Sequence, residues 1–258
     1  MEQTIEIIVS GQGSDISNDF YEPLNIPIND YEAKLGIKSF ATYNNIPNVI
    51  EGENNGLKIK VPGHDYKVFH LDTGAYELDL ISEQLSEWIA VTYPELKDVD
   101  DNFRLVPNYA TSKADFVLKG DYGVDFDIDG SMYDLLGFDK TDKLEGTGKY
   151  SGKRIVNISS VTQLIFNCNI TSCNYIDGKE MPFLYSCAVN VPVGFRLFRE
   201  LTDISYKSLN TDQISHIRIW IVDQDGHTVN LRKDNLTVTL SLKLSPLVKE
   251  VKLHQPVQ

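Results

Sequence analysis

Two acidic segments contain the residues whose types and spacing could bind a metal ion. In the first, Asp125, Asp127, Asp129 and Gly130 match the first half of a calcium-binding loop, where carboxylates alternate along a tight turn. The twelfth position of such a loop needs a bidentate Glu, but Leu136 stands there. No helix is predicted before the loop, so we interpret the segment as the acidic end of a strand.

The second segment, Asp223-Gln-Asp-Gly226, also resembles a calcium turn. It lies between two apolar stretches at 219–222 and 228–231, and Asp-Gly supplies the positive φ of a tight connection. A hairpin turn explains it better than a metal site. The sequence therefore predicts no metal and no other cofactor.

Nucleophilic and phosphate chemistry find no support in the residue pattern. The three cysteines, Cys168, Cys173 and Cys187, lack zinc-ligand spacing, so we interpret them as reduced thiols. Gly148-Lys149 and Gly152-Lys153 lack the upstream Gly and the following Ser or Thr of a phosphate-binding loop. We predict that the chain is not an enzyme; catalysis would need a carboxylate pair that the sequence does not reveal.

The elements that would position any site are predicted to be strands. Hydrophobic residues make up 41% of the 258 residues, with 13 Tyr and 11 Phe beside many Val, Ile and Thr. Turn signals separate about a dozen strand-like stretches, which is typical of an all-β sandwich or barrel. The net charge of -13, without a basic stripe, argues against direct nucleic-acid binding. We expect no signal peptide, synthesis inside the cell and no membrane span.

One amphipathic helix is predicted at about residues 77–91, before Pro94. Its apolar face carries residues at helical spacing, namely Leu78, Ile81, Leu85, Trp88 and Ile89. A short helical turn closed by Gly137 is predicted at 131–138.

The chain is predicted to begin with a strand and an extended arm at residues 1–35, because 10–30 are rich in Gly, Ser, Asp, Asn and Pro. A β-sandwich follows at 36–245 and a polar tail at 246–258. The Gly-rich stretch 139–153 is the candidate internal boundary. One sandwich with additions and two stacked sandwiches both stay open, and we favour one sandwich because no linker-like shift in composition divides the chain convincingly.

Several short motifs occur in a fixed order along residues 36–244. They are Phe40–Val49 with Asn54-Asn55, Gly74–Ile81, Leu105–Asn108, Leu135–Phe138, Val156–Ile158, Pro192–Phe195 and Ile217–Asn230. As a set they resemble a family of jelly-roll capsid proteins of adintoviruses and Polinton (Maverick) elements, of the penton-like minor capsid type.

The resemblance implies a jelly-roll virion protein without a cofactor that forms a cyclic homo-oligomer beside other capsid proteins. A penton role implies five copies at a capsid vertex, whereas a trimer would indicate a fibre or major-capsid role. Aromatic residues in polar segments are the candidates for surface buried between copies. They are Phe20, Tyr21, Tyr43 and Tyr150.

A binding module is the alternative function. A β-sandwich attachment domain that recognises a receptor or glycan would present exposed aromatic residues beside carboxylates. Tyr122, Asp125 and Asp127 are the candidates for such a site.

Overall fold

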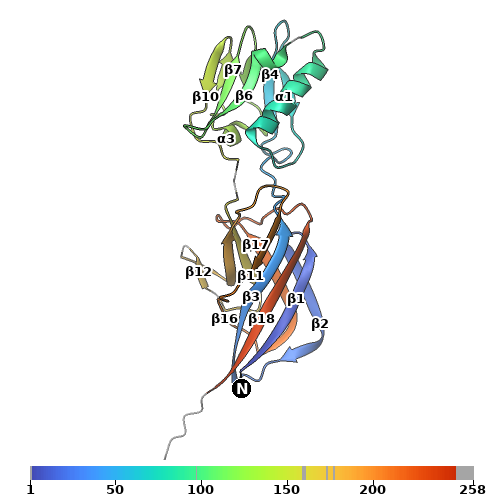
Figure 1. Cartoon of the computed structure of the whole chain (residues 1–258), viewed down its shortest axis with the longest axis vertical. Coiled ribbons are helices and arrows are strands. Elements are labelled where there is room, and N and C mark those ends of the chain that lie inside the picture. Colours follow the sequence, from blue (N-terminus) through green and yellow to red (C-terminus); the bar gives the residue numbers. More distant parts are fainter. Residues whose placement is uncertain (1, 97, 159–160, 173, 177, 248–258) are drawn as a thin grey trace, which may run out of the picture. The chain divides into compact units, whose positions relative to one another are not determined.

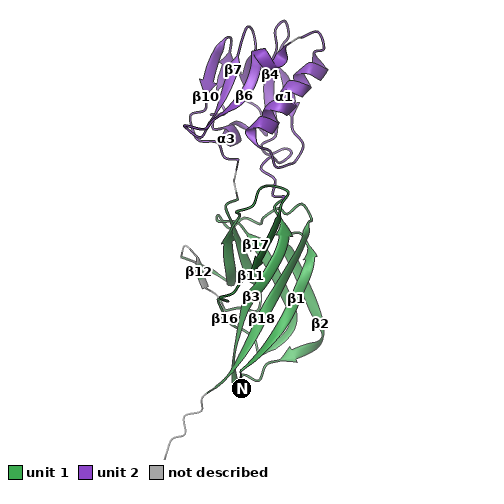
Figure 2. Ribbon diagram, viewed as in Figure 1, with its two compact units in different colours: residues 1–44, 161–258 green, residues 45–160 purple. Residues whose placement is uncertain are grey.

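Antiparallel strands are the main regular secondary structure of the chain, which the computed structural model describes except for residues 1, 97, 159–160, 173, 177 and 248–258 (Figure 1). The chain divides into two units (Figure 2). Unit 1 comprises residues 1–44 and 161–258, and unit 2 comprises residues 45–160. Unit 2 is therefore inserted in the sequence of unit 1.

Two antiparallel sheets contain the eight principal strands of unit 1. Sheet A has the spatial order β1 (Gln3–Gln12), β18 (Asn235–Pro246), β3 (Tyr31–Tyr43) and β15 (Arg196–Glu200). Sheet B has the spatial order β14 (Phe183–Ala188), β11 (Gln163–Cys168), β17 (Gln213–Val222) and β2 (Asp15–Asn25). The remaining short strands of unit 1 are β16 (Lys207–Ser208), which pairs with β3, and the hairpin of β12 (Asn174–Ile176) and β13 (Lys179–Met181).

The pairing of these eight strands defines the fold of unit 1. Counted along the chain, the first strand pairs with the eighth, the second with the seventh, the third with the sixth and the fourth with the fifth. A long hairpin wrapped over two sheets in this way is a jelly roll. The predicted all-β jelly-roll sandwich is thus confirmed for unit 1, and unit 2 occupies the connection between the third strand and the fourth.

The interior of unit 1 is apolar because its strands alternate inward and outward side chains. Phe40 of β3 and Phe166 of β11 come from different sheets, and their ring centroids lie 4.7 Å apart. β18 shows the predicted alternation, with buried side chains at Leu236, Val238, Leu240, Leu242 and Leu244. Apolar contact between the two inner faces therefore holds the sandwich together.

The N-terminal arm expected at residues 1–35 is part of the sandwich. β1 pairs with β18 and β2 pairs with β17 through the polar region that the sequence predicts to be an arm. β2 is an edge strand that exposes most of its side chains while burying Ile16. An edge strand can therefore carry the polar composition that is typical of a loop.

The described residues of unit 2 form two smaller antiparallel sheets and three helices. The four-stranded sheet has the order β5 (Lys67–His70), β4 (Gly56–Lys60), β8 (Gly123–Asp125) and β9 (Lys143–Glu145). The three-stranded sheet has the order β10 (Gly148–Ser151), β7 (Lys113–Leu118) and β6 (Phe103–Asn108). The helices are α1 (Leu78–Thr92), α2 (Val99–Asn102) and α3 (Tyr133–Leu136).

The predicted amphipathic helix is confirmed as α1, and the predicted short turn as α3. The predicted apolar face of α1 packs into the core of unit 2. The Oγ atom of Ser82 on α1 also accepts a hydrogen bond from the Leu105 N–H of β6 at 3.2 Å. α1 therefore covers a strand edge that would otherwise be open. α3 ends at Gly137, which has a φ of 78°.

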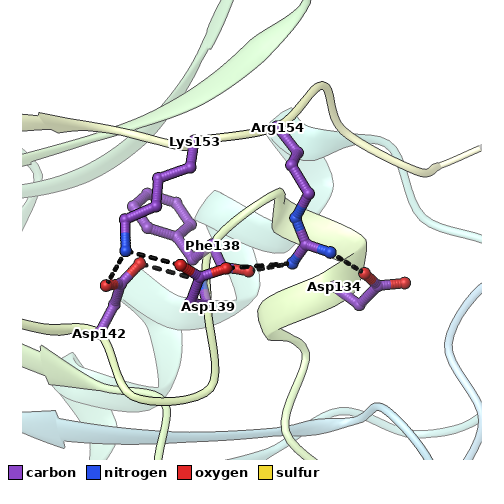
Figure 3. A network of polar contacts seen from close by, with 6 residues as sticks. All are labelled: Asp134, Phe138, Asp139, Asp142, Lys153 and Arg154. Atoms are coloured by element: carbon purple, nitrogen blue, oxygen red, sulfur yellow. Dashed lines mark hydrogen bonds and ion pairs between the residues drawn. The ribbon is translucent and has the colours of Figure 1, made fainter.

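The candidate boundary at 139–153 lies inside unit 2, where ion pairs hold it (Figure 3). Lys153 Nζ lies 2.7 Å from Asp139 and 2.6 Å from Asp142, and Arg154 lies 2.8 Å from Asp134. Arg154 also donates a hydrogen bond to the carbonyl of Phe138. Charged residues of the stretch that suggested a linker take part in this network, and the divisions between the units fall at 44/45 and 160/161.

Asn48 joins the first and last segments of unit 2. Its Nδ2 donates to the carbonyls of Tyr76 at 2.7 Å and Ile158 at 3.0 Å, and its Oδ1 accepts the Tyr76 N–H at 2.8 Å. A buried amide must satisfy its polar atoms, and Asn48 does so with backbone groups of unit 2.

Candidate functional site

The acidic loop after β8 does not gather its carboxylates. Asp125 lies 3.9 Å from Lys58 and accepts the Asp127 N–H at 2.8 Å, while Asp129 lies 3.4 Å from Lys140. Among the described residues, the cluster with three potential ligand atoms within 4.8 Å of one another lies elsewhere. These carboxylates therefore pair with lysines or shape the turn.

That cluster consists of Asp223, Asp225 and His227. Asp223 Oδ1 accepts the N–H groups of Asp225 and His227, each at 2.9 Å, and Gly226 has a φ of 87°. The backbone also closes here, because the Asp223 N–H donates to the His227 carbonyl at 2.9 Å. The predicted tight turn is confirmed, and its carboxylate serves the turn itself.

The thiols in the described part of the chain are not activated as nucleophiles. Burial raises the pKa of Cys168 and of Cys187 to about 11. Since the thiolate is the nucleophile, neither group is activated near neutral pH. Cys173 lies outside the described residues.

Two of the aromatic candidates lie within unit 2. Tyr122 is 4% exposed, so it cannot form the platform of a glycan site beside Asp125 and Asp127. Tyr150 is half-buried against the core of unit 2, and its hydroxyl donates to the Glu145 carbonyl. The sequence predicts both rings to be surface groups, but Tyr122, just before β8, and Tyr150, in β10, both pack on the core of unit 2.

The other aromatic candidates lie on unit 1, and two of them occupy a bulge in β2. The register between β2 and β17 shifts there, so residues 20–23 lie opposite the single residue Ser215. Tyr21 is fully exposed and Phe20 is half-buried. A hollow of about 530 Å³ lies between the bulge and β1, lined in part by Phe20 and by Ile8, which is 60% exposed.

Most charges beside the bulge are paired within the chain. Arg218 donates to Asp15 at 2.8 Å, which lowers the pKa of that carboxyl, and His216 lies 2.8 Å from Asp19. Glu22, in the bulge, has no ion-pair partner among the described residues. We call Ile8, Tyr21 and Glu22, with the hollow between them, the acidic edge.

A second apolar surface lies at β15. Phe195 and Phe198 are 62% and 52% exposed, and Val193 and Tyr43 are also exposed. The Arg196 guanidinium lies 5.4 Å from the centroid of the Phe198 ring and has no carboxylate partner in the described part of the chain. We call Val193, Phe195, Arg196 and Phe198 the basic edge, and Tyr43 neighbours it through the pairing of β3 with β15.

The chain before β15 is held in place by Asn44. The Asn44 carbonyl accepts the Gly194 N–H at 2.8 Å, its N–H donates to the Phe195 carbonyl at 2.9 Å, and its side chain donates to Val191 at 2.7 Å. Gly194 has a φ of 81°, which favours glycine. The Pro-Val-Gly-Phe motif is therefore a fixed turn that presents an exposed ring.

The acidic and basic edges lie on opposite sides of the sandwich. β1 and β15 end the order of sheet A, and β2 and β14 end the order of sheet B. β1 and β2 lie together at one side (Figure 1), where Asn18 of β2 donates to the Ile8 carbonyl at 3.2 Å. Sequence reasoning missed Ile8 and Phe198 because periodicity does not tell which sheet face meets solvent.

Unit 2 has a separate hollow of about 350 Å³ beside the start of α1. Its lining includes apolar side chains such as Val156 and Ile158, with Glu77, Asp79 and the exposed ring of Tyr109. A pocket of this size and mixed character can hold a small ligand.

The comparisons with known proteins concern the fold. No protein-family model and no curated protein matches the sequence. The structure is similar to a crystal structure of the mavirus penton protein, with a TM-score of 0.49 and 11% identity, covering 96% of this chain and 100% of that chain. The jelly-roll assignment follows from the strand pairing of unit 1 and is independent of this match. Among the described residues, every helix is too short or too polar to span a bilayer.

Proposed function

We propose that this chain is a structural subunit of a virion, a penton-like jelly-roll capsid protein that assembles with copies of itself into a closed ring at the capsid vertex. The observation that carries the proposal is a jelly roll that exposes aromatic side chains at both open sides of its sandwich. Exposed apolar surface and unpaired strand edges favour association with another chain.

Two further observations support an assembly role. The described part of the chain contains no activated thiol, and its one cluster of three potential metal ligands serves a turn. The order of the motifs along residues 36–244 resembles that of jelly-roll capsid proteins. Function by assembly needs neither a reacting group nor a cofactor, and it places the protein in the virion beside other capsid proteins.

Light scattering coupled to size exclusion tests this proposal over a range of protein concentrations. A discrete ring, with a pentamer as the expected mass, supports a vertex subunit. A trimer would indicate a fibre or major-capsid role and contradict the penton assignment. A chain that stays monomeric at high concentration would contradict self-assembly altogether.

An attachment module is the second candidate, and the hollow beside Tyr109 is the observation that favours it. The ring could pack on the apolar face of a sugar while Glu77 and Asp79 accept hydrogen bonds from its hydroxyls. A glycan array probed with the wild-type chain and with Tyr109→Ala tests this function. Binding that the substitution removes would support it, and an array without binding would reject it.

A further inference from the structure

We propose that copies of this chain associate head to tail, with the basic edge of one copy seated in the hollow of the acidic edge of the next. This inference rests on the proposed assembly function and specifies the contact that produces it. The occupant of the hollow is thus a second copy of the chain, through Phe195 and Phe198.

The shapes of the two edges are complementary. The acidic edge has a hollow of about 530 Å³ between β1 and the β2 bulge, with Ile8 and Phe20 in its lining. The basic edge projects two phenylalanine rings that are each more than half exposed. Aromatic anchors that fill a pocket on the partner are the usual source of binding energy in protein interfaces.

The charges of the two edges are complementary as well. Glu22 lines the hollow, and Arg196 lies between the two exposed rings in the sequence. Among the described residues, neither side chain has an ion-pair partner of opposite charge within its own chain, whereas neighbouring Asp15 and Asp19 do. Contact between copies would therefore pair Glu22 with Arg196, and such a pair sets orientation and specificity.

The placement of the edges determines the kind of symmetry. A twofold dimer needs one patch that is complementary to itself, but two like-charged acidic edges would repel each other. Two different patches on opposite sides of a subunit instead give a head-to-tail contact, which closes into a ring when the rotation per copy allows it. The hydrogen bonds of Asn44 to Val191, Gly194 and Phe195 fix the backbone around Phe195 before contact. Little conformational entropy is therefore lost there on association.

Charge reversal tests the contact in the full-length chain. Glu22→Arg and Arg196→Glu are made singly and together, and assembly is followed by light scattering over a concentration series. We expect each single variant to need roughly 10- to 100-fold more protein to assemble, because it places like charges together. The assembly midpoint is the protein concentration at which half of the chains are assembled. The double variant should have the wild-type midpoint, because its charges at positions 22 and 196 are again opposite.

Glu83→Arg and Lys119→Glu are matched controls, since both reverse an exposed charge in unit 2. They should leave the assembly midpoint unchanged. If the wild type assembles but the single variants assemble equally well, the head-to-tail contact is wrong while the assembly function stands. If the single variants fail and the double variant also fails, Glu22 and Arg196 are not partners. If the wild type itself stays monomeric, both the contact and the proposed function are overturned.

Discussion

The two units differ in how far they bury their phenylalanine side chains. All five phenylalanines of unit 2 are buried, whereas two of the six in unit 1, Phe195 and Phe198, are more than half exposed. Unit 2 also covers the edge of β6 with α1, through Ser82. Among the described residues, the outer strands of both sheets of unit 1 have no further strand beside them, and the same holds for β5, β9 and β10 of unit 2. The units thus differ in the exposure of their phenylalanine rings, and the contact that we propose between copies uses the exposed rings of unit 1.

The largest expected effects come from removing one core ring in each unit. Phe116→Ala in unit 2 and Phe166→Ala in unit 1 should each lower the free energy of unfolding by about 3–5 kcal/mol, because both rings are fully buried. Each unit contains one tryptophan, Trp88 in unit 2 and Trp220 in unit 1. In a Trp220→Phe background the fluorescence of Trp88 reports the unfolding of unit 2 in denaturant. In a Trp88→Phe background the fluorescence of Trp220 reports the unfolding of unit 1.

We expect Phe116→Ala to shift the Trp88 transition and leave the Trp220 transition in place, with the reverse result for Phe166→Ala. Equal shifts of both transitions in either variant would show that the units unfold as one, and the comparison between them would then lose its basis.

A smaller effect is expected from adding a methyl group next to Arg154, in the ion-pair network of unit 2. Gly137 and Gly146 both have positive φ values, so an Ala at either position costs about 1–2 kcal/mol of backbone strain. A Cβ at Gly137 would also lie 2.3 Å from the Arg154 carbonyl oxygen, whereas nothing lies within 4 Å of one at Gly146. Gly137→Ala should therefore be less stable than Gly146→Ala by about a further 1–3 kcal/mol.

Chemical denaturation followed at Trp88 measures this difference. Equal stabilities for the two variants would mean that the backbone around Arg154 can shift at little cost in free energy. Residues 139–153 would then be held less rigidly than the ion pairs suggest.

The buried carboxylate of unit 2 gives a pH-dependent effect. Burial alone would raise the pKa of Asp115, but hydrogen bonds from Lys149, Ser151 and Asn108 outweigh it and hold this pKa below its ordinary value of 3.8. Asp115→Asn should cost about 1.5–3 kcal/mol at neutral pH, as expected for a lost hydrogen bond to a charged group.

A depressed carboxyl pKa stabilises the fold above the unfolded-state pKa, and that contribution is lost as pH falls through the folded-state pKa. The difference in the free energy of unfolding between wild type and Asp115→Asn should thus be constant at pH 5 and above, in roughly the range where the unfolded carboxyl is ionised. This difference should become smaller in more acidic solution. Urea titrations at several pH values measure the difference, and a difference that grows with acid would contradict the assignment.

The smallest effect on stability is expected at the surface of unit 1. Tyr21→Ser should change the free energy of unfolding by less than about 0.5 kcal/mol, because the ring is fully exposed. Tyr150→Ser should cost more, because that ring packs on the core of unit 2 and its hydroxyl is bonded. A clear loss of monomer stability in Tyr21→Ser would show that the bulge supports the fold rather than a contact.

The sequence predicted the elements whose pattern is local. The spacing of α1, the alternation of β18 and the Asp-Gly turn each depend on neighbouring residues, and all three are found in the structure. The all-β class follows from composition for the same reason.

The division between the units could not be read from the sequence. The chain crosses between them next to Asn44, where the sequence predicts only a corner between two strands of one sandwich, and next to Val161, within a stretch that looks like one continuous strand. Glycines and charges gather instead at 139–153, where they form turns and ion pairs. Which aromatic rings meet solvent was equally hidden, because the face of a strand depends on the sheet that it joins. Phe40 of β3 is buried and Phe198 of the neighbouring β15 is 52% exposed for this reason.

Hydrogen–deuterium exchange of the full-length chain, compared between dilute and assembling concentrations, tests the central claim most directly. Assembly through the edges of unit 1 predicts slower exchange on association in residues 18–24 and 193–199, with unit 2 unchanged. Protection that appears in unit 2 instead, or exchange that is identical at both concentrations, would contradict the assignment of assembly to the open sides of the sandwich.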